Sequence, residues 1–194
     1  TGSRLVVWGN SYAIDKFKEI IVIGAGKAAA HMAQAVEKVL GNRISNGIII
    51  VKYGHTSPLK HIVQIEAGHP IPDEAGIKGT EEIVRFLKKA DKHTLVICLL
   101  SGGASSLLVS PLDGTTLKDK KKVTDMLLSA GADIEELNAV RKHVSKVKGG
   151  RLAEMAYPAK VITMLVSDVI GNKLDVIASG PTVPDTTTFK DAVM

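Results

Sequence analysis

Residues 19–36 read EIIVIGAGKAAAHMAQAV. They predict a buried strand over residues 20–23, a turn built on Gly24 and Gly26, and a helix that begins near Lys27. A continuous β-branched run is typical of a parallel strand that is covered on both faces. This stretch therefore predicts the first strand–turn–helix unit of a parallel α/β sheet.

The turn itself is a candidate anion site. Gly24 and Gly26 allow a tight turn and the close approach of a ligand, and a helix N-terminus offers N–H groups and the positive end of a dipole. Lys27 adds a cation at the same place. We expect this turn to hold a phosphate group that Lys27 faces; the alternative is an ordinary tight turn with a solvated lysine.

Two known phosphate motifs fit this turn poorly. The loop G-x-x-x-x-G-K-[ST] is not matched, whereas the dinucleotide fingerprint G-x-G-x-x-[GA] is matched loosely by residues 24–29. The fingerprint also requires an acidic residue about 20 residues further on. The next predicted strand, residues 48–51, is followed by Lys52-Tyr53-Gly54-His55. The missing acid disfavours NAD binding.

Further strands and helices alternate along the chain. Strands are predicted at residues 48–51, 62–65, 95–100 and 161–166, and helices at 28–40, 74–89, 118–129 and 134–148, with Asp73 and Asp133 as N-caps. Such alternation indicates an α/β fold with a doubly wound, mainly parallel sheet and helices on both faces. Ligands of such sheets bind beyond the carboxyl ends of the strands, where the unusual residues fall: 24–27, His55, His69, 101–106 and Ser167-Asp168.

Composition narrows the class of protein. The 194 residues are enough for one α/β domain, and the net charge of +5 fits a small anionic substrate better than a nucleic-acid duplex. Aromatic residues make up only 4%, so stacking platforms for nucleic acid are lacking. Cys98 lies in an apolar run and is expected to be buried and inert. No signal peptide or membrane-length apolar run is visible, and we expect a cytoplasmic protein.

A second glycine turn follows the predicted strand 95–100. Ser101-Gly102-Gly103-Ala104-Ser105-Ser106 can present successive N–H groups and hydroxyls to a phosphate or carboxylate. The alternative is a helix N-terminus whose small residues allow close packing. The motif G-x-S-x-G is absent, which argues against a nucleophilic serine.

The predicted helix 134–148 carries a polar stripe. Asn138, Arg141, Lys142, Ser145 and Lys148 recur at helical spacing, and Arg151 follows after two glycines. Such a stripe can hold a carboxylate or polyphosphate, or it is a solvated face. The basic run 118–122 is expected to lie on a solvated face as well.

Acidic residues near the expected site are few. Asp168, after the predicted strand 161–166, is a candidate to bind Mg²⁺ or to accept a proton from a substrate hydroxyl, and otherwise caps a turn. His55 and His69 are either a metal pair or plain hydrogen-bonding groups.

Seven motifs in order resemble the glycerate 2-kinase family, the group with a C-terminal MOFRL domain. The resemblance covers residues 20–185, and it rests on Gly24-Ala25-Gly26-Lys27-Ala28, Lys52-Tyr53-Gly54-His55, Glu66-Ala67-Gly68-His69-Pro70-Ile71-Pro72-Asp73, Ser101-Gly102-Gly103, Asn138-Ala139-Val140-Arg141-Lys142-His143, Lys148-Gly149-Gly150-Arg151 and Ser167-Asp168-Val169-Ile170-Gly171 with Asp175-Val176-Ile177-Ala178-Ser179-Gly180-Pro181-Thr182.

The resemblance implies a kinase that uses ATP and Mg²⁺ or another divalent cation to phosphorylate the 2-hydroxyl of D-glycerate. It implies that residues 1–194 form one Rossmann-like N-terminal domain of a two-domain enzyme, with the active site in the interdomain cleft, the MOFRL domain absent from this chain, and a possible homodimer. Its site residues would be Lys27, Arg141 and Asp168 for catalysis, the last also for metal; Gly24, Gly26, Ser101, Gly102, Gly103, Ser105 and Ser106 for ATP; and His69, Asn138, Lys142, Lys148 and Ser179 for substrate.

The sequence differs from the family motif at one position, and two alternative functions remain open. The family loop is usually Ser-Gly-Gly-Gly-Ser, whereas position 104 is Ala here, which puts a positive φ at that position in doubt. Some members of the family are labelled hydroxypyruvate reductases, which would use NAD(P). The other rival is a non-catalytic domain that binds a phosphosugar or a nucleotide.

Overall fold

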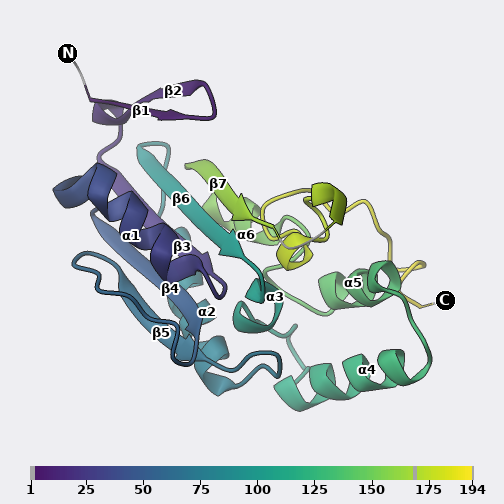
Figure 1. Cartoon of the computed structure of the whole chain (residues 1–194). Coiled ribbons are helices and arrows are strands. Elements are labelled where there is room, and N and C mark those ends of the chain that lie inside the picture. The colour runs from purple at the N-terminus through teal and green to yellow at the C-terminus, as the bar shows by residue number, and fades with distance from the viewer. Residues whose placement is uncertain (1–2, 168–169, 194) are drawn as a thin grey trace.

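The computed structural model describes residues 3–167 and 170–193. Its centre is a five-stranded parallel sheet in the order β5-β4-β3-β6-β7, as Figure 1 shows. The strands are β3 (Glu19–Ala25), β4 (Asn46–Lys52), β5 (Val63–Ala67), β6 (Thr94–Ser101) and β7 (Lys160–Val166). The strand order reverses between β3 and β6, and ligands of such sheets bind beyond the carboxyl ends of the strands at this reversal. The predicted parallel α/β sheet is confirmed.

Helices cover both faces of the sheet. On one face α1 (Ala29–Leu40) packs Ala33 and Val36 against Val22 of β3 and its neighbours. On the other face α2 (Glu74–Leu87) and α6 (Arg151–Ala156) contribute Ile83 and Leu152 to a second core. Every residue of β6 is buried, because this central strand is covered on both sides. A hairpin of β1 (Arg4–Val7) and β2 (Asn10–Ala13) stands beyond the sheet (Figure 1).

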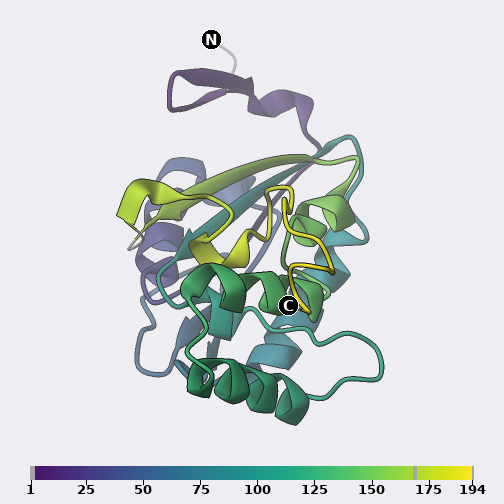
Figure 2. The ribbon, with the colours of Figure 1, turned by 90° about the vertical axis from the view of Figure 1, so that its right-hand side faces the viewer.

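The remaining helices gather beside the carboxyl end of β6. They are α3 (Ala104–Leu107), α4 (Leu117–Ser129) and α5 (Ile134–His143). Short 3-10 turns lie elsewhere along the chain, at Ile14–Lys16, Gly41–Arg43, Ile170–Asn172 and Ile177–Ser179. Figure 2 shows α4 and α5 one above the other. Asp73 and Asp133 cap α2 and α5 as predicted, and Thr116 forms a capping box with Asp119 on α4. In the described ranges no helix is long and apolar enough to cross a membrane.

The helix predicted over residues 134–148 is too long, because α5 ends at His143. Beyond it the backbone finds partners far away in the chain: Lys146 N–H donates to Ser110 O at 2.9 Å, and Ser145 forms an antiparallel bridge with Pro111. The side chain of Arg151 also donates hydrogen bonds to the carbonyls of Ser145 and Lys148 in this segment. The helical spacing of the valines concealed this break.

Candidate functional site

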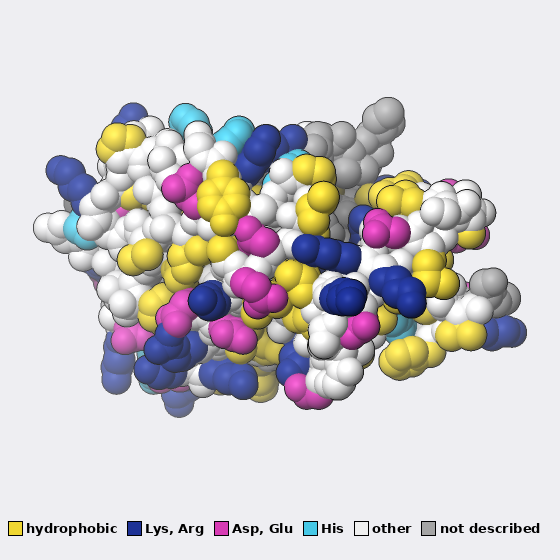
Figure 3. Space-filling model, turned by 90° about the horizontal axis from the view of Figure 1, so that it is seen from below, with side chains coloured by type: hydrophobic (Ala, Val, Ile, Leu, Met, Phe, Trp, Pro, Cys, Tyr) yellow, Lys and Arg dark blue, Asp and Glu magenta, His cyan; other side chains and the backbone are white. Residues whose placement is uncertain are grey.

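A cleft of about 590 Å³ lies beside the loop that follows β6. The loop after β5 supplies His69, Pro70, Ile71 and Pro72, and the turn after β6 with α3 and its continuation supplies Gly103, Ser105, Ser106 and Val109. The remaining lining residues are Lys120, Lys121, Thr124, Asp125 and Leu128 of α4, Arg141 of α5 and Lys148 of the segment after α5. Figure 3 shows Lys and Arg side chains gathered over α4 on this side of the molecule. The volume falls within the roughly 300–1,000 Å³ that small-molecule sites occupy.

Three cations of this cleft have no carboxylate to neutralise them among the described residues. Lys148 is 2% exposed, and its Nζ donates to the Ser105 carbonyl at 2.8 Å and to Ser105 Oγ at 3.0 Å. Lys120 Nζ donates to Val144 O at 2.9 Å. The guanidinium of Arg141 has no hydrogen-bond partner in residues 3–167 and 170–193. Burying charge in this way is costly without a counterion, so the three groups, called the cation triad below, favour an anion.

The pKa values of the cation triad record the same cost. Burial, and then the nearby charge of Arg141, lowers the pKa of Lys120 to about 8. Burial, followed by the charges of Lys120 and Arg141, holds the pKa of Lys148 well below its ordinary value, and burial lowers the pKa of Arg141. A bound anion would reverse these effects, because an opposite charge stabilises the protonated forms.

The loop after β6 contributes backbone donors. Within the part of the chain that the structure describes, no acceptor meets the N–H groups of residues 102–105. The positive φ falls on Gly103 (+87°), whereas Ala104 begins α3, so the alanine at this position is tolerated. A Cβ on Gly103 would lie 2.6 Å from Cδ2 of His69. Only glycine therefore permits this loop to pass beneath the imidazole ring.

The first glycine turn, at Gly24 and Gly26, is needed for packing within the chain. A Cβ on Gly24 would lie 2.3 Å from Leu99 O, and one on Gly26 would lie 2.1 Å from Ser101 Oγ. The N–H groups at the start of α1 also donate internally: Gly26 to Ile50 O, Lys27 to Gly102 O, Ala28 to Ser101 Oγ and Ala29 to Gly26 O. The expectation of free N–H groups is therefore wrong for residues 26–29, and these glycines allow β3 to pack closely against β6.

The side chain of Lys27 remains available. It is exposed, and its charge acts on His69. Burial, and then the charges of Lys27 and Lys52, lowers the pKa of His69, which favours the neutral form of the ring. The Nδ1 atom of His55 lies 3.3 Å from the Lys27 carbonyl. Lys27 and His69 thus lie near one another, beside the cleft.

A buried chain of hydrogen bonds runs from Lys148 to α5. Lys148 donates to Ser105 Oγ, the Ser105 and Ser179 hydroxyls lie 2.8 Å apart, and Ser179 Oγ donates to Asn138 Oδ1 at 3.1 Å. Because Ser179 has one hydroxyl proton and gives it to Asn138, Ser105 donates to Ser179. Ser179 and Asn138 therefore stand behind Lys148, and they act on the cleft through it.

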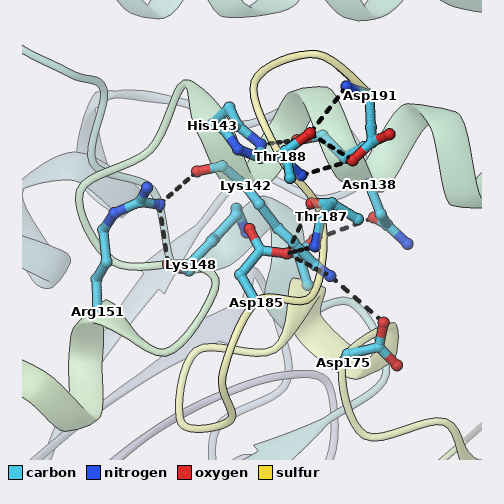
Figure 4. Close-up of polar contacts among 12 residues, drawn as sticks. Asn138, Lys142, His143, Lys148, Arg151, Asp175, Asp185, Thr187, Thr188 and Asp191 are labelled. Carbon is cyan, nitrogen blue, oxygen red and sulfur yellow. Dashed lines mark hydrogen bonds and ion pairs between the residues drawn. The ribbon is translucent and has the colours of Figure 1, made fainter.

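Lys142 lies apart from the cation triad. It is 2% exposed, and its Nζ lies 3.4 Å from Asp175 Oδ2 and 3.3 Å from Asp185 Oδ1 (Figure 4). It lines a separate pocket of about 510 Å³, which Asn138 also lines. Arg151 donates from Nη1 to the carbonyls of Lys142 and Lys148 at 2.7 and 3.2 Å (Figure 4). It also donates to the carbonyl of Ser145 at 3.2 Å. The predicted polar stripe is thus not one surface, and its members 138, 142, 145 and 148 are buried.

Two features of the cleft escaped the sequence analysis. Lys120 was expected on a solvated face, but it is half-buried and lines the cleft. The spacing of Leu117, Lys120 and Thr124 places Lys120 on the less exposed face of α4, and that spacing was the signal. The apolar wall formed by residues 70–72 had no signal beyond two prolines.

The metal prediction cannot be placed. Asp168 lies outside the described residues, and in the described ranges no group of three His, Cys, Asp or Glu side chains is arranged to hold a metal ion. A metal pair of His55 and His69 would need further ligands from elsewhere.

Comparison with known proteins places the chain in a family. The model of the family described as "Domain of unknown function (DUF4147)" matches residues 3–194. A D-glycerate 2-kinase of Thermotoga maritima is 49% identical over 175 residues, covering 90% of this chain and 42% of the relative. A crystal structure of a Pyrococcus horikoshii protein superposes with a TM-score of 0.92 at 47% identity, covering 97% of this chain and 42% of that one.

A putative hydroxypyruvate reductase of Agrobacterium vitis is also 49% identical, over 172 residues, which are 89% of this chain and 45% of the relative. The chain spans less than half the length of these relatives. The chain belongs to the DUF4147 family and is a homologue of glycerate 2-kinases, which confirms the family resemblance seen in the sequence.

Proposed function

We propose that the chain is the N-terminal, Rossmann-like part of a D-glycerate 2-kinase. The reaction transfers the γ-phosphoryl group of ATP to the 2-hydroxyl of D-glycerate and gives 2-phospho-D-glycerate and ADP. The observation that carries the proposal is the cation triad of Lys120, Arg141 and Lys148, which lies unneutralised in a cleft at the carboxyl edge of the sheet. The kinase relative at 49% identity supports the choice of reaction.

Phosphoryl transfer depends mainly on positioning and on neutralisation of charge. Lys27 and Arg141 are the proposed catalytic cations, since neither side chain is tied to a carboxylate among the described residues. The loop 101–106 is the proposed phosphate cradle; Ser101 supports it by accepting from Ala28 N–H, and Ser106 by donating to Gly103 O. Lys148 adds a buried donor to it.

Other residues take supporting roles in this proposal. His69 borders the cleft, and Asn138 and Ser179 orient Lys148 through Ser105. Lys142 does not line the cleft; it forms an ion pair with Asp185 and so holds the segment that carries this residue. When bound, Mg²⁺ would screen the charge of the ATP phosphates; Asp168 is its proposed ligand, and no step above depends on the metal.

The rest of the enzyme is also part of the proposal. Because the chain covers 42% of its kinase relative, we infer that a C-terminal MOFRL-type domain completes the active site. A cytoplasmic location, expected from the sequence, and a possible homodimer remain predictions.

The reductase is the weaker candidate, although one relative carries that name. A dinucleotide would need free N–H groups at the start of α1, and those of residues 26–29 donate within the chain. It would also need an acid after the second strand of the unit, where β4 ends at Lys52. Both observations favour the kinase.

The test is a phosphoryl-transfer assay with ATP, Mg²⁺ and D-glycerate on the native polypeptide that contains this chain, with 2- and 3-phosphoglycerate resolved by NMR. We expect 2-phosphoglycerate, and we expect the 194-residue chain alone to be inactive. A parallel assay follows NADH oxidation with hydroxypyruvate. Oxidation of NADH without 2-phosphoglycerate would replace the kinase with the reductase, and ligand binding without turnover would favour the non-catalytic domain.

A further inference from the structure

The cleft described above has two unlike sides. Pro70, Ile71 and Pro72 on the loop after β5, with Val109 and Leu128, give it an apolar wall, whereas the cation triad lies on the other elements. The loop with two prolines is stiff, so this wall is preformed. A site that takes only a small hydrophilic acid has no use for such a wall, because apolar surface contributes when it meets an apolar ligand group.

The charges that line the cleft also favour a ligand larger than D-glycerate. Lys120, Arg141 and Lys148 bring three positive charges when protonated, and the lining residues Lys121 and Asp125 offset each other. D-glycerate offers one carboxylate, which would leave most of this charge unneutralised. The triphosphate of a nucleotide carries several negative charges at neutral pH, and it can therefore neutralise all three of these buried or half-buried cations.

Lys148 is set to face a multivalent anion. An ammonium group has three donors, and the Ser105 carbonyl and hydroxyl take two of them. In the described part of the chain the third meets no acceptor. The side chain is also tied to the loop after β6 and is therefore part of the phosphate cradle, rather than of a separate acid-binding site.

We propose that this cleft is the nucleotide subsite: the triphosphate of ATP lies on Lys120, Arg141 and Lys148, and the base lies against the wall of residues 70–72, Val109 and Leu128. The inference rests on the proposed kinase function and deepens it, because it assigns D-glycerate to a position outside this cleft, on the side of Lys27. The cleft should therefore select ligands in which a large apolar ring is joined to a polyphosphate.

Binding is tested by calorimetry on the native polypeptide that contains this chain, with ATP, tripolyphosphate and D-glycerate each added alone. Arg141→Gln should weaken ATP and tripolyphosphate alike by at least about tenfold, and Arg141→Lys should restore part of the affinity. Leu128→Ala should weaken ATP by about fivefold and leave tripolyphosphate unchanged. Met126→Ala is the matched control: it lies on the same helix and is 60% exposed, against 57% for Leu128, but it does not line the cleft.

Each outcome decides the inference. Equal loss of ATP and tripolyphosphate affinity in Leu128→Ala, or no ATP binding by the unaltered native polypeptide, would overturn it. So would variants of the native polypeptide that raise the KM for D-glycerate and leave that for ATP unchanged, while continued formation of 2-phosphoglycerate would leave the kinase function intact. Conversely, ATP bound in this cleft without any 2-phosphoglycerate would uphold the subsite and refute the proposed function.

Discussion

Replacing Lys120 with Met should stabilise the fold while it weakens anion binding. The pKa of Lys120 falls from 10.5 to about 8 because of burial first and then Arg141, so its charged form costs the folded state about 3 kcal/mol. The substitution also removes the hydrogen bond to Val144 O, worth about 1 kcal/mol. The expected net gain at pH 7 is therefore about 2 kcal/mol in the free energy of unfolding.

The gain should depend on pH in a defined direction. Below pH 8 the lysine is protonated in both states, and the wild type carries the full penalty. Between about pH 8 and 10.5 the folded state loses its proton first, so the stability of the wild type rises toward that of the variant. Above 10.5 both states are neutral, and only the lost hydrogen bond remains.

Urea denaturation at pH 7 and at high pH measures this difference. The buffer must be free of phosphate, because a bound anion would stabilise the wild type. Lys122→Met on the same helix is the control, since Lys122 is exposed and its replacement should change stability by less than about 0.5 kcal/mol. A variant that is no more stable than the wild type at pH 7, or a gain that does not shrink at high pH, would refute the reasoning.

Three further predictions follow from the site and the sheet. Lys27→Ala in the native polypeptide should lower kcat by orders of magnitude without lowering the urea midpoint, because the side chain is exposed; Lys38→Ala, on the far end of α1, should leave kcat unchanged. Gly24→Ala should destabilise the chain by about 3 kcal/mol in the same denaturation experiment, since its Cβ would meet Leu99 O at 2.3 Å. A urea midpoint equal to that of the wild type would contradict the close packing of β3 against β6. The affinity for tripolyphosphate should fall above about pH 8 in the wild type relative to Lys120→Met, because Lys120 then loses its proton; calorimetry that finds the same pH dependence in both proteins would contradict the role of Lys120.

Local signals were enough to predict the sheet and its helices. The β-branched runs of β3, β4 and β6 mark strands buried on both faces, and Asp73 and Asp133 mark helix starts through hydrogen bonds to N–H groups only two or three residues away. Such contacts lie within the window that a sequence displays directly.

The cleft depended on contacts that no local pattern contains. Lys148 was placed on a surface stripe because lysine is rarely buried without a partner, yet its partner Ser105 lies 43 residues away. The glycines of the first turn suggested a ligand, whereas the group that approaches them is β6. Residue type and spacing name the right segments, but only packing decides which side chains face one another.

The hydrogen-bonded chain behind Lys148 also couples the cleft to a segment far along the sequence. Ser179 lies 74 residues beyond its partner Ser105, and Ser105 in turn accepts from Lys148. The N–H groups of Gly149 and Gly150 donate to the carbonyls of Ser179 and Gly180 and hold the same segment in place. A local opening of residues 177–180 would therefore change the donor geometry of Lys148 while the five-stranded sheet stays intact. Affinity for a polyphosphate would then report whether this segment is docked.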